Sequence, residues 1–275
     1  METNILQETV GIVIPSYNQC EFLEQTILSV LQQNVLKKIA LVDGGSIDSS
    51  ASIIEKYQNE FTYWRSYKDS GQASAINEGA SKLYNCEFIC WINSDDIYLL
   101  DGLVKMKNFL INNPEYDAIY GKAYVIDKCG KVIGSYPTKE FNKNQFSKEC
   151  FICQPATLIR NSCWKELGGL NPNLFMCLDY DLWLRIINKG RIAYLEEYVA
   201  CSRDHEETKT NNYQTQGFQE AFLILKRNYG YVPFNWILSY EYNKHFTKHK
   251  TKPKFWDKNR ILFFSILRFL YYYKI

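Results

Sequence analysis

The chain has 275 residues, 46% hydrophobic and 16% aromatic, with a formal net charge of +2, which indicates a globular protein. Its nine cysteines are scattered mostly through apolar runs, so we expect reduced core thiols; the Cys150-x-x-Cys153 pair lacks the second pair that a zinc site needs. The first residues have neither a basic region nor a long apolar one, so we expect no signal peptide and no early transmembrane helix.

Short apolar runs alternate with helical patterns over the first 111 residues. Strands are predicted at 10–14, 39–42, 63–67 and 88–92, and helices at 49–57, 73–83 and 103–111. The helix after the first strand is expected to begin at Asn18, because Glu21 follows three residues later as in a capping box. Four β-α units in succession predict a parallel, doubly wound sheet.

The pattern changes after Tyr116. The runs at 118–120, 123–126 and 132–136 are predicted antiparallel additions, with a turn at 128–130. A helix is predicted from Leu178, with Asp179 on its inward face and Asp181 paired with Arg185 on the other side. An inward acid in a first turn caps the helix, is buried at a cost, or opens into a cavity.

The last 32 residues are strongly basic. From Lys244 to Ile275 there are nine Lys or Arg and one acid, a net charge of +8, whereas the rest of the chain carries −6. Aromatic residues interleave this charge, which favours an anionic membrane surface over nucleic acid. Arg268 interrupts the apolar run at 261–273, so the segment is expected to lie on a bilayer and not to cross it. The alternative is a basic helix that packs on the domain or on a partner chain.

Each of the four predicted β-α strands is followed by a short polar loop. The loops are Pro15-Ser16-Tyr17-Asn18, Asp43-Gly44-Gly45-Ser46, Asp69-Ser70-Gly71-Gln72 and Asn93-Ser94-Asp95-Asp96. Ligands of doubly wound sheets bind at the carboxyl ends of the strands, where such loops converge. The sequence has no GxxxxGK[ST] or GxGxxG phosphate loop. Acidic loops instead hold a nucleotide diphosphate by recruiting a divalent cation, which takes carboxylate and phosphate oxygens together.

Asp95 and Asp96 are adjacent carboxylates at the end of the fourth predicted strand. Helix capping is the alternative role, but Asp101 stands directly before the periodic apolar residues of the next helix and is better placed as its cap. Neighbouring carboxylates repel each other unless a cation or hydrogen-bond donors compensate, so metal binding is favoured.

Five motifs, taken together in this order and spacing, resemble family 2 glycosyltransferases with the GT-A fold. They are Val13-Ile14-Pro15-Ser16-Tyr17-Asn18, Val42-Asp43-Gly44-Gly45-Ser46-Ile47-Asp48, Asp69 with Ala75-Ile76-Asn77-Glu78-Gly79, Asn93-Ser94-Asp95-Asp96 and Asp179-Tyr180-Asp181-Leu182-Trp183-Leu184-Arg185. The resemblance covers residues 8–210. It implies an α/β protein whose doubly wound, mostly parallel sheet has a smaller antiparallel addition. We expect a GT-A domain at 1–215, with its nucleotide-binding half at about 1–121 and its acceptor-binding half at about 122–215. A helical, basic and aromatic extension is expected at 216–275.

The resemblance implies an inverting hexosyl- or N-acetylhexosaminyltransferase that uses Mn²⁺ or Mg²⁺. Its donor would be a nucleotide diphosphate sugar, UDP by default, and its acceptor a glycan hydroxyl. Asp179 matches the catalytic base, and Asp95 matches the metal position of the DxD motif, with Asp96 and His205 as further metal ligands. The nucleotide-binding residues carried over are Pro15, Tyr17, Asn18, Asp43, Gly44, Asp69, Gln72, Asn77, Ser94 and Asp95. The acceptor-binding residues carried over are Gln154, Trp164, Asp181 and Trp183.

Three positions depart from the family pattern. Gly44 replaces an acid that often contacts the base, Asn93 replaces the first acid of DxD, and Leu178 replaces the acid before the base. These departures keep open a non-catalytic carbohydrate- or partner-binding module on the same fold. A nucleotidyltransferase is the other alternative, and the missing basic phosphate loop argues against it.

Together, the resemblance and the basic tail imply a role in cell-surface polysaccharide or O-antigen assembly. We expect a lipid-linked oligosaccharide as acceptor and no nucleic acid partner. The expected location is the cytoplasm, peripherally at the inner face of the plasma membrane.

Overall fold

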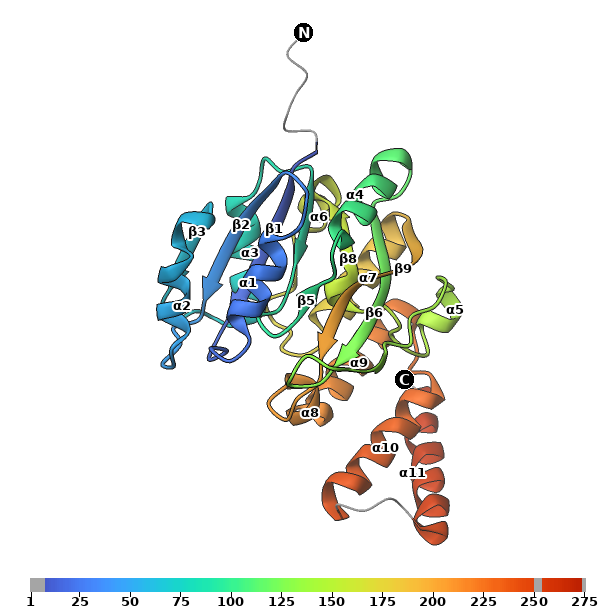
Figure 1. Ribbon diagram of the computed structural model, residues 1–275. Coiled ribbons are helices and arrows are strands. Elements are labelled where there is room, and N and C mark those ends of the chain that lie inside the picture. Colours follow the sequence, from blue (N-terminus) through green and yellow to red (C-terminus); the bar gives the residue numbers. More distant parts are fainter. Residues whose placement is uncertain (1–7, 250–253, 274–275) are drawn as a thin grey trace. The chain divides into compact units, whose positions relative to one another are not determined.

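The computed structural model describes residues 8–249 and 254–273 (Figure 1). The chain divides into two compact units. The first unit runs to Phe141 and resumes from Phe151 to His205, and the second comprises Asn142–Cys150 and the chain from Glu206 onward.

Nine strands of the described residues form one sheet in the order β3-β2-β1-β4-β8-β6-β9-β5, with β7 beside β6. The strands are β1 (Val10–Ser16), β2 (Lys37–Asp43), β3 (Tyr63–Ser66), β4 (Phe88–Trp91), β5 (Ile97–Tyr98), β6 (Ala118–Ile126), β7 (Val132–Ser135), β8 (Thr157–Arg160) and β9 (Ile192–Arg203). The half made of β3, β2, β1 and β4 is parallel throughout. In the other half, β8 runs antiparallel to β4 and β6, whereas β9 runs parallel to β6. The carboxyl ends of β1 to β4 therefore lie along one edge, which is the edge predicted to bind the ligand.

Helices flank both faces of this sheet (Figure 1). They are α1 (Leu23–Leu31), α2 (Ser50–Lys56), α3 (Gln72–Lys82), α4 (Gly102–Asn112), α6 (Asn161–Leu167) and α7 (Leu178–Lys189). All seven residues of β1 are buried, as a central parallel strand covered on both faces requires. Helix α3 approaches β1 closely at Gly79, where a Cβ atom would lie 2.6 Å from Cγ1 of Val13. The strand ends are thus held by a well-packed core.

The predicted β-α units are confirmed, but parts of the structure differ from the predictions. Helix α1 begins at Leu23 and has no side-chain cap, because Asn18 adopts a positive φ of 52° and uses its side chain elsewhere. The runs at 118–120 and 123–126 are one continuous strand, β6, which pairs with β7 through the predicted turn. The 12-residue strand β9 was not predicted from the sequence.

The second unit is helical. Its helices are α5 (Lys143–Phe146), α8 (Lys209–Asn212), α9 (Gln214–Tyr229), α10 (Phe234–His249) and α11 (Phe255–Tyr273). Aromatic rings form its core: Phe222 of α9 lies 5.6 Å from Tyr240 of α10 and 5.6 Å from Tyr272 of α11, edge to face in both pairs. Among the described residues, no helix is long and apolar enough to cross a membrane.

Candidate active site

Hydrogen bonds join the loop after β1 to the loop after β2. The N–H of Asn18 donates to Oγ of Ser46 at 2.7 Å, and Oδ1 of Asn18 accepts from the N–H of Ile47 at 2.9 Å. The positive φ of Asn18, which asparagine tolerates better than most residues, turns its side chain toward the second loop. Next to it, Tyr17 is 61% exposed and lies over Gly44. These two loops therefore form one rigid rim with an exposed aromatic ring.

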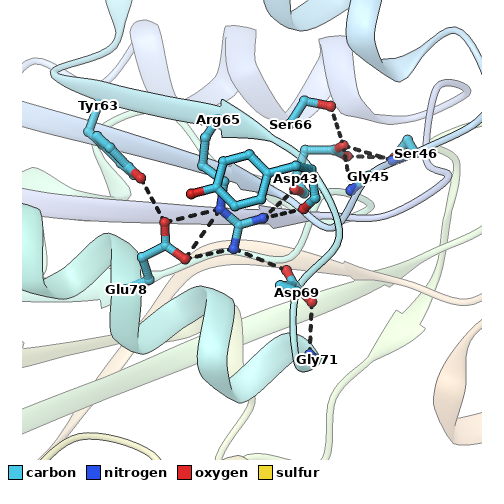
Figure 2. Close-up of polar contacts among 10 residues, drawn as sticks. Asp43, Gly45, Ser46, Tyr63, Arg65, Ser66, Asp69, Gly71 and Glu78 are labelled. Carbon is cyan, nitrogen blue, oxygen red and sulfur yellow. Dashed lines mark hydrogen bonds and ion pairs between the residues drawn. The ribbon is translucent and has the colours of Figure 1, made fainter.

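Asp43 organises the loop that follows β2. Its carboxylate accepts hydrogen bonds from the N–H groups of Gly45 and Ser46 and from the hydroxyls of Ser46 and Ser66, at 2.5–3.0 Å (Figure 2). Asp43 has no exposed surface. In this structure Asp43 shapes the loop, and its contact with the nucleotide stays a prediction.

We expect Gly45→Ala to destabilise the protein more than a change at an ordinary glycine. Gly45 has a φ of +81°, and a Cβ atom there would lie 2.8 Å from the backbone nitrogen of Lys68. The positive φ costs about 1–2 kcal/mol, and overpacking adds about 1–3 kcal/mol. Gly168→Ala is the matched control, since Gly168 also has a positive φ but has open space around it. Urea unfolding should give the larger loss for Gly45→Ala; equal losses would contradict the close approach.

Arg65, at the centre of Figure 2, holds the loop after β3 against helix α3. Its guanidinium is buried and donates to the carboxylate of Glu78 at 2.7 Å, to Asp69 at 3.3 Å and to the carbonyls of Asp43 and Tyr67, both at 2.6 Å. The hydrogen bonds from Arg65 to Glu78 lower the pKa of the Glu78 carboxyl. Asp69 also accepts from the N–H of Gly71 at 2.8 Å, and Gly44 lies beside its carboxylate. Asp69 is therefore fixed at the rim, next to Gly44 and Tyr17.

Three side-chain amides connect the loops after β3 and β4 to the segment directly before β8. Gln72 donates to Oδ1 of Asn93 at 2.8 Å, and Asn93 donates to Oε1 of Gln154 at 3.3 Å. Gln154 in turn donates to the carbonyl of Trp91 at 2.8 Å. Asn93 also donates to Asp96 at 3.2 Å, a contact that a carboxylate at position 93 would turn into repulsion. An amide at position 93, where the family pattern has an acid, therefore fits the neighbouring Asp96.

Asp95 and His205 are 110 residues apart in sequence and meet at the end of β4. Oδ2 of Asp95 lies 3.1 Å from Nε2 of His205, whose ring packs on Phe22. Arg203 fixes this arrangement, because its Nε donates to the backbone carbonyl of Asp95 at 2.7 Å. The unpredicted strand β9 thus brings the late histidine to the loop after β4.

Asp96 points inward, away from this pair. Its Oδ1 accepts from the N–H of Arg203 at 2.9 Å, and its Oδ2 accepts from Asn93. Burial and the nearby charge of Asp95 raise the pKa of Asp96 well above its ordinary value. In this structure Asp96 joins β9 to the loop, and its role as a metal ligand stays a prediction.

The Asp95 and His205 pair fits a divalent cation bound together with a diphosphate. Adjacent ligands of an octahedral ion at about 2.1 Å are about 3 Å apart, close to the separation of these two atoms. Among the described residues, no group of three or more His, Cys, Asp and Glu side chains could hold a metal ion. The protein would thus supply one oxygen and one nitrogen ligand, and substrate phosphates and water would complete the site.

Asp179 lies in the first turn of α7, one turn before Trp183 and on the same face. The ring of Trp183 stacks on Trp91, the last residue of β4, with centroids 5.9 Å apart and planes at 13°. This contact directs the face that carries Asp179 toward the end of β4. Burial raises the pKa of the Asp179 carboxyl above its ordinary value of 3.8, which strengthens it as a base.

Three residues predicted to bind the acceptor lie in the core. Trp164 and Trp183 flank Trp91 and are 6% and 0% exposed. Asp181 is 1% exposed and pairs with Arg185, whose guanidinium also holds the carbonyls of Leu167 and Gly169. The aromatic rings therefore serve packing, and Asp181 is not on the outer side of the helix. Gln154 alone of the four lies at the strand ends.

Three residues predicted to bind the nucleotide are buried or hydrogen-bonded within the protein. Pro15 and Ser94 are buried at the ends of the first and fourth strands. Asn77 both donates to the carbonyl and accepts from the N–H of Leu170, at 2.8 and 2.9 Å. The other predicted nucleotide-binding residues lie in or next to the loops that follow β1 to β4. They are Tyr17, Asn18, Gly44, Asp69, Gln72 and Asp95.

Sequence reasoning missed two arginines. Arg65 interrupts a strand of large side chains, and Arg203 ends β9 next to an acid and a histidine. A buried arginine needs hydrogen-bond or ion-pair partners. An arginine in a predicted strand beside acidic loops could therefore have identified Arg65 from the sequence. The partners of Arg203 come from residues 25, 95, 127 and 128, and only the fold brings these together.

Comparisons with known proteins identify the family. The model of the family "Glycosyl transferase family 2" matches residues 11–168, more than half of the chain. An uncharacterized glycosyltransferase of Rickettsia typhi is 26% identical over 221 residues, which cover 77% of this chain and 69% of the relative.

Two solved structures share the fold. Staphylococcus aureus TarS 1–349 in complex with UDP-GlcNAc has a TM-score of 0.63 at 16% identity, covering 96% of this chain and 81% of that one. The mannosyltransferase PcManGT from Pyrobaculum calidifontis, in complex with GDP-Man and Mn²⁺, has a TM-score of 0.60 at 11% identity, covering 94% and 79%. The chain belongs to glycosyl transferase family 2 and has the predicted GT-A fold.

Proposed function

We propose that this glycosyltransferase is an inverting, metal-assisted enzyme that uses a nucleotide diphosphate sugar. The observation that carries the proposal is the meeting of Asp95 and His205 at 3.1 Å, beside the loops that follow β1 to β4. In this proposal the 1–121 half binds the donor, with Tyr17, Gly44 and Asp69 at the base and Asp95 at the diphosphate. The 122–215 half binds the acceptor.

The proposed reaction is an in-line displacement at the anomeric carbon. An acceptor hydroxyl oxygen forms the new bond to that carbon, while the bond to the nucleotide diphosphate breaks and its electron pair leaves with the phosphate oxygen. Asp179 takes the hydroxyl proton, and attack from the face opposite the leaving group inverts the configuration. A bound Mn²⁺ or Mg²⁺ supplies positive charge for the departing diphosphate, and Asp95 and His205 would hold it in place.

UDP is the proposed donor nucleotide. Its support is the fold shared with TarS, whose solved structures contain UDP and UDP-GlcNAc, although the mannosyltransferase contains GDP-Man. In this proposal Gly44, Tyr17 and Asp69 select the base of the nucleotide, because Tyr17 and Asp69 both lie beside Gly44 at the rim. The transferred sugar would be a hexose or an N-acetylhexosamine.

The proposed acceptor is a lipid-linked glycan in cell-surface polysaccharide assembly, such as that of O-antigen. Support comes from the basic and aromatic segment beyond residue 216, which we propose as an extension separate from the transferase domain. Such an enzyme would work in the cytoplasm at the inner face of the plasma membrane. Supplying lipid-linked sugars with the donor and measuring released nucleotide diphosphate tests this acceptor class.

A thermal-shift panel tests the donor site. We expect UDP with Mn²⁺ or Mg²⁺ to raise the Tm, and GDP, TDP, CMP or a chelator to give little or no shift. A ligand at 100 times its Kd stabilises by about 2.7 kcal/mol, which corresponds to several degrees for a domain of this size. Asp95→Ala should lose the metal-dependent part of the shift.

Asp96→Asn is the matched variant, and it should keep that shift because its carboxyl is turned toward Arg203 and Asn93. Loss of the metal effect in Asp96→Asn with a normal Tm would restore Asp96 as a metal ligand. If the unmodified protein shifts with none of the nucleotides, the non-catalytic binding module becomes the better proposal.

A further inference from the structure

Helix α11 packs on α9 and α10 along one side. Ile261 and Ser265 are buried on that side. Arg268, the only charged residue between 261 and 273, is turned the same way: its Nε donates to Glu241 of α10 at 2.7 Å, and its guanidinium lies over the ring of Tyr240. The charge in this part of the helix is therefore neutralised inside the unit.

The opposite side of α11 is apolar and exposed. Every exposed side chain from position 262 to 273 is aliphatic or aromatic, with exposed fractions of 43–64%. These eight residues, named here the α11 face, are Leu262, Phe263, Phe264, Ile266, Leu267, Leu270, Tyr271 and Tyr273. Soluble monomers rarely expose contiguous apolar patches of more than a few hundred Å², so a face of this kind marks an interaction surface.

Positive charge lies around the N-terminal end of this helix, at one end of the face. Lys254, Lys258 and Arg260 are exposed there. The acid among them, Asp257, accepts from the N–H of Lys254 at 3.0 Å and lies 3.9 Å from Nε2 of His245. The segment from 244 onward carries a net charge of +8. A second copy of the chain would bring two such charges together, whereas anionic lipid headgroups neutralise them.

We propose that the α11 face docks on the surface of a bilayer that contains anionic phospholipid. The apolar side chains enter the headgroup and acyl boundary, and Lys254, Lys258 and Arg260 contact the headgroups. A helix with such a face lies in the plane of the interface. The inference rests on the proposed function, because docking would bring the enzyme to the membrane surface that holds the proposed lipid-linked acceptor.

Vesicle flotation with the full chain tests the docking, and it needs neither donor nor acceptor. The probes are vesicles of phosphatidylcholine alone and vesicles with one third phosphatidylglycerol. Phe263→Ser, Leu267→Ser and Leu270→Ser combined should weaken partition to the anionic vesicles by at least roughly 100-fold, since three large apolar side chains no longer enter the lipid. The matched control combines Leu36→Ser, Leu100→Ser and Ile133→Ser, which are 51%, 74% and 56% exposed outside this face, and it should bind like the unmodified protein.

A second variant separates charge from apolar contact. Lys258→Glu with Arg260→Glu should weaken binding to anionic vesicles by about five-fold or more per residue, and less so in high salt. Binding to neutral vesicles should be weak in every variant. Equal binding to neutral and anionic vesicles would overturn the part of the proposal that concerns charge.

Two results would overturn the docking itself. One is unchanged partition of the triple serine variant. The other is a dimer, seen by light scattering without lipid, that this variant dissociates, since a second copy would then cover the face. The nucleotide thermal shift keeps the two proposals apart: a chain that binds vesicles but no nucleotide contradicts the proposed enzyme and leaves the docking intact.

Discussion

Asp179→Asn should reduce turnover by about 10²- to 10⁴-fold and leave the nucleotide thermal shift unchanged. The loss is the usual contribution of a general base to such a step. Donor binding survives because the proposed donor contacts come from the loops after β1 to β4 and not from α7. Release of nucleotide diphosphate with a supplied acceptor measures the first effect, and the thermal shift measures the second. Turnover retained in this variant would contradict the assignment of Asp179 as the base.

The pH dependence of kcat provides an independent check on Asp179. Its pKa is raised by burial, so the carboxyl becomes protonated, and inactive as a base, at a higher pH than an ordinary aspartic acid. The acid limb of the unmodified enzyme should therefore have its midpoint above 3.8. Asp101→Asn is the matched control: Asp101 is exposed at a φ of +60°, a conformation that asparagine also accepts, so turnover should not change. A midpoint at or below 3.8 would contradict a buried base.

The sequence predicted the strands and their loops well because both signals are local. A strand such as 10–14 is recognisable from its own β-rich apolar run, and the polar loop after it follows from the strand's end. The parallel order then places four loops on one edge without any further information. The start of α1 was wrong for the same reason: Asn18 and Glu21 match a local capping pattern, but Asn18 instead bonds across the sheet to Ser46 and Ile47.

The direction of individual side chains could not be predicted, because it depends on partners far along the chain. Asp95 and Asp96 are adjacent in sequence and were both predicted as metal ligands, yet one faces His205 and the other accepts the N–H of Arg203. Both partners lie on or just after β9, more than 100 residues away. Trp183 was a candidate for sugar stacking until Trp91 was found against its ring. Family resemblance locates the loops, and only long-range packing decides which members of each loop face the ligand.

Arg65→Met should strongly destabilise the first unit. The variant leaves the carboxylates of Asp69 and Glu78 without their cation and removes donors from the carbonyls of Asp43 and Tyr67. Breaking a buried pair by removing one partner costs about 3–5 kcal/mol. The Glu78 side chain is 29% exposed, so we expect about 3 kcal/mol, near the lower end. Thermal unfolding should show a Tm lower by roughly 6–12 °C.

The pH dependence of the unfolding free energy distinguishes the loss of the Arg65–Glu78 ion pair from general damage to the fold. Arg65 lowers the pKa of Glu78, so the stability it provides is present above the ordinary value of 4.5 and is lost as the pH falls through the lowered folded value. The gap in unfolding free energy between Arg65→Met and the unmodified protein should therefore narrow at acid pH. Lys56→Met is the matched control, because Lys56 pairs with Glu24 in a solvent-exposed contact, which contributes little to stability. A gap that stays constant with pH would mean that lost hydrogen bonds to the loop carbonyls, and not compensation of the acids, account for the role of Arg65. Because Asp69 belongs to the same network, the loss of Arg65 should also weaken the nucleotide thermal shift, whereas Lys56→Met should not.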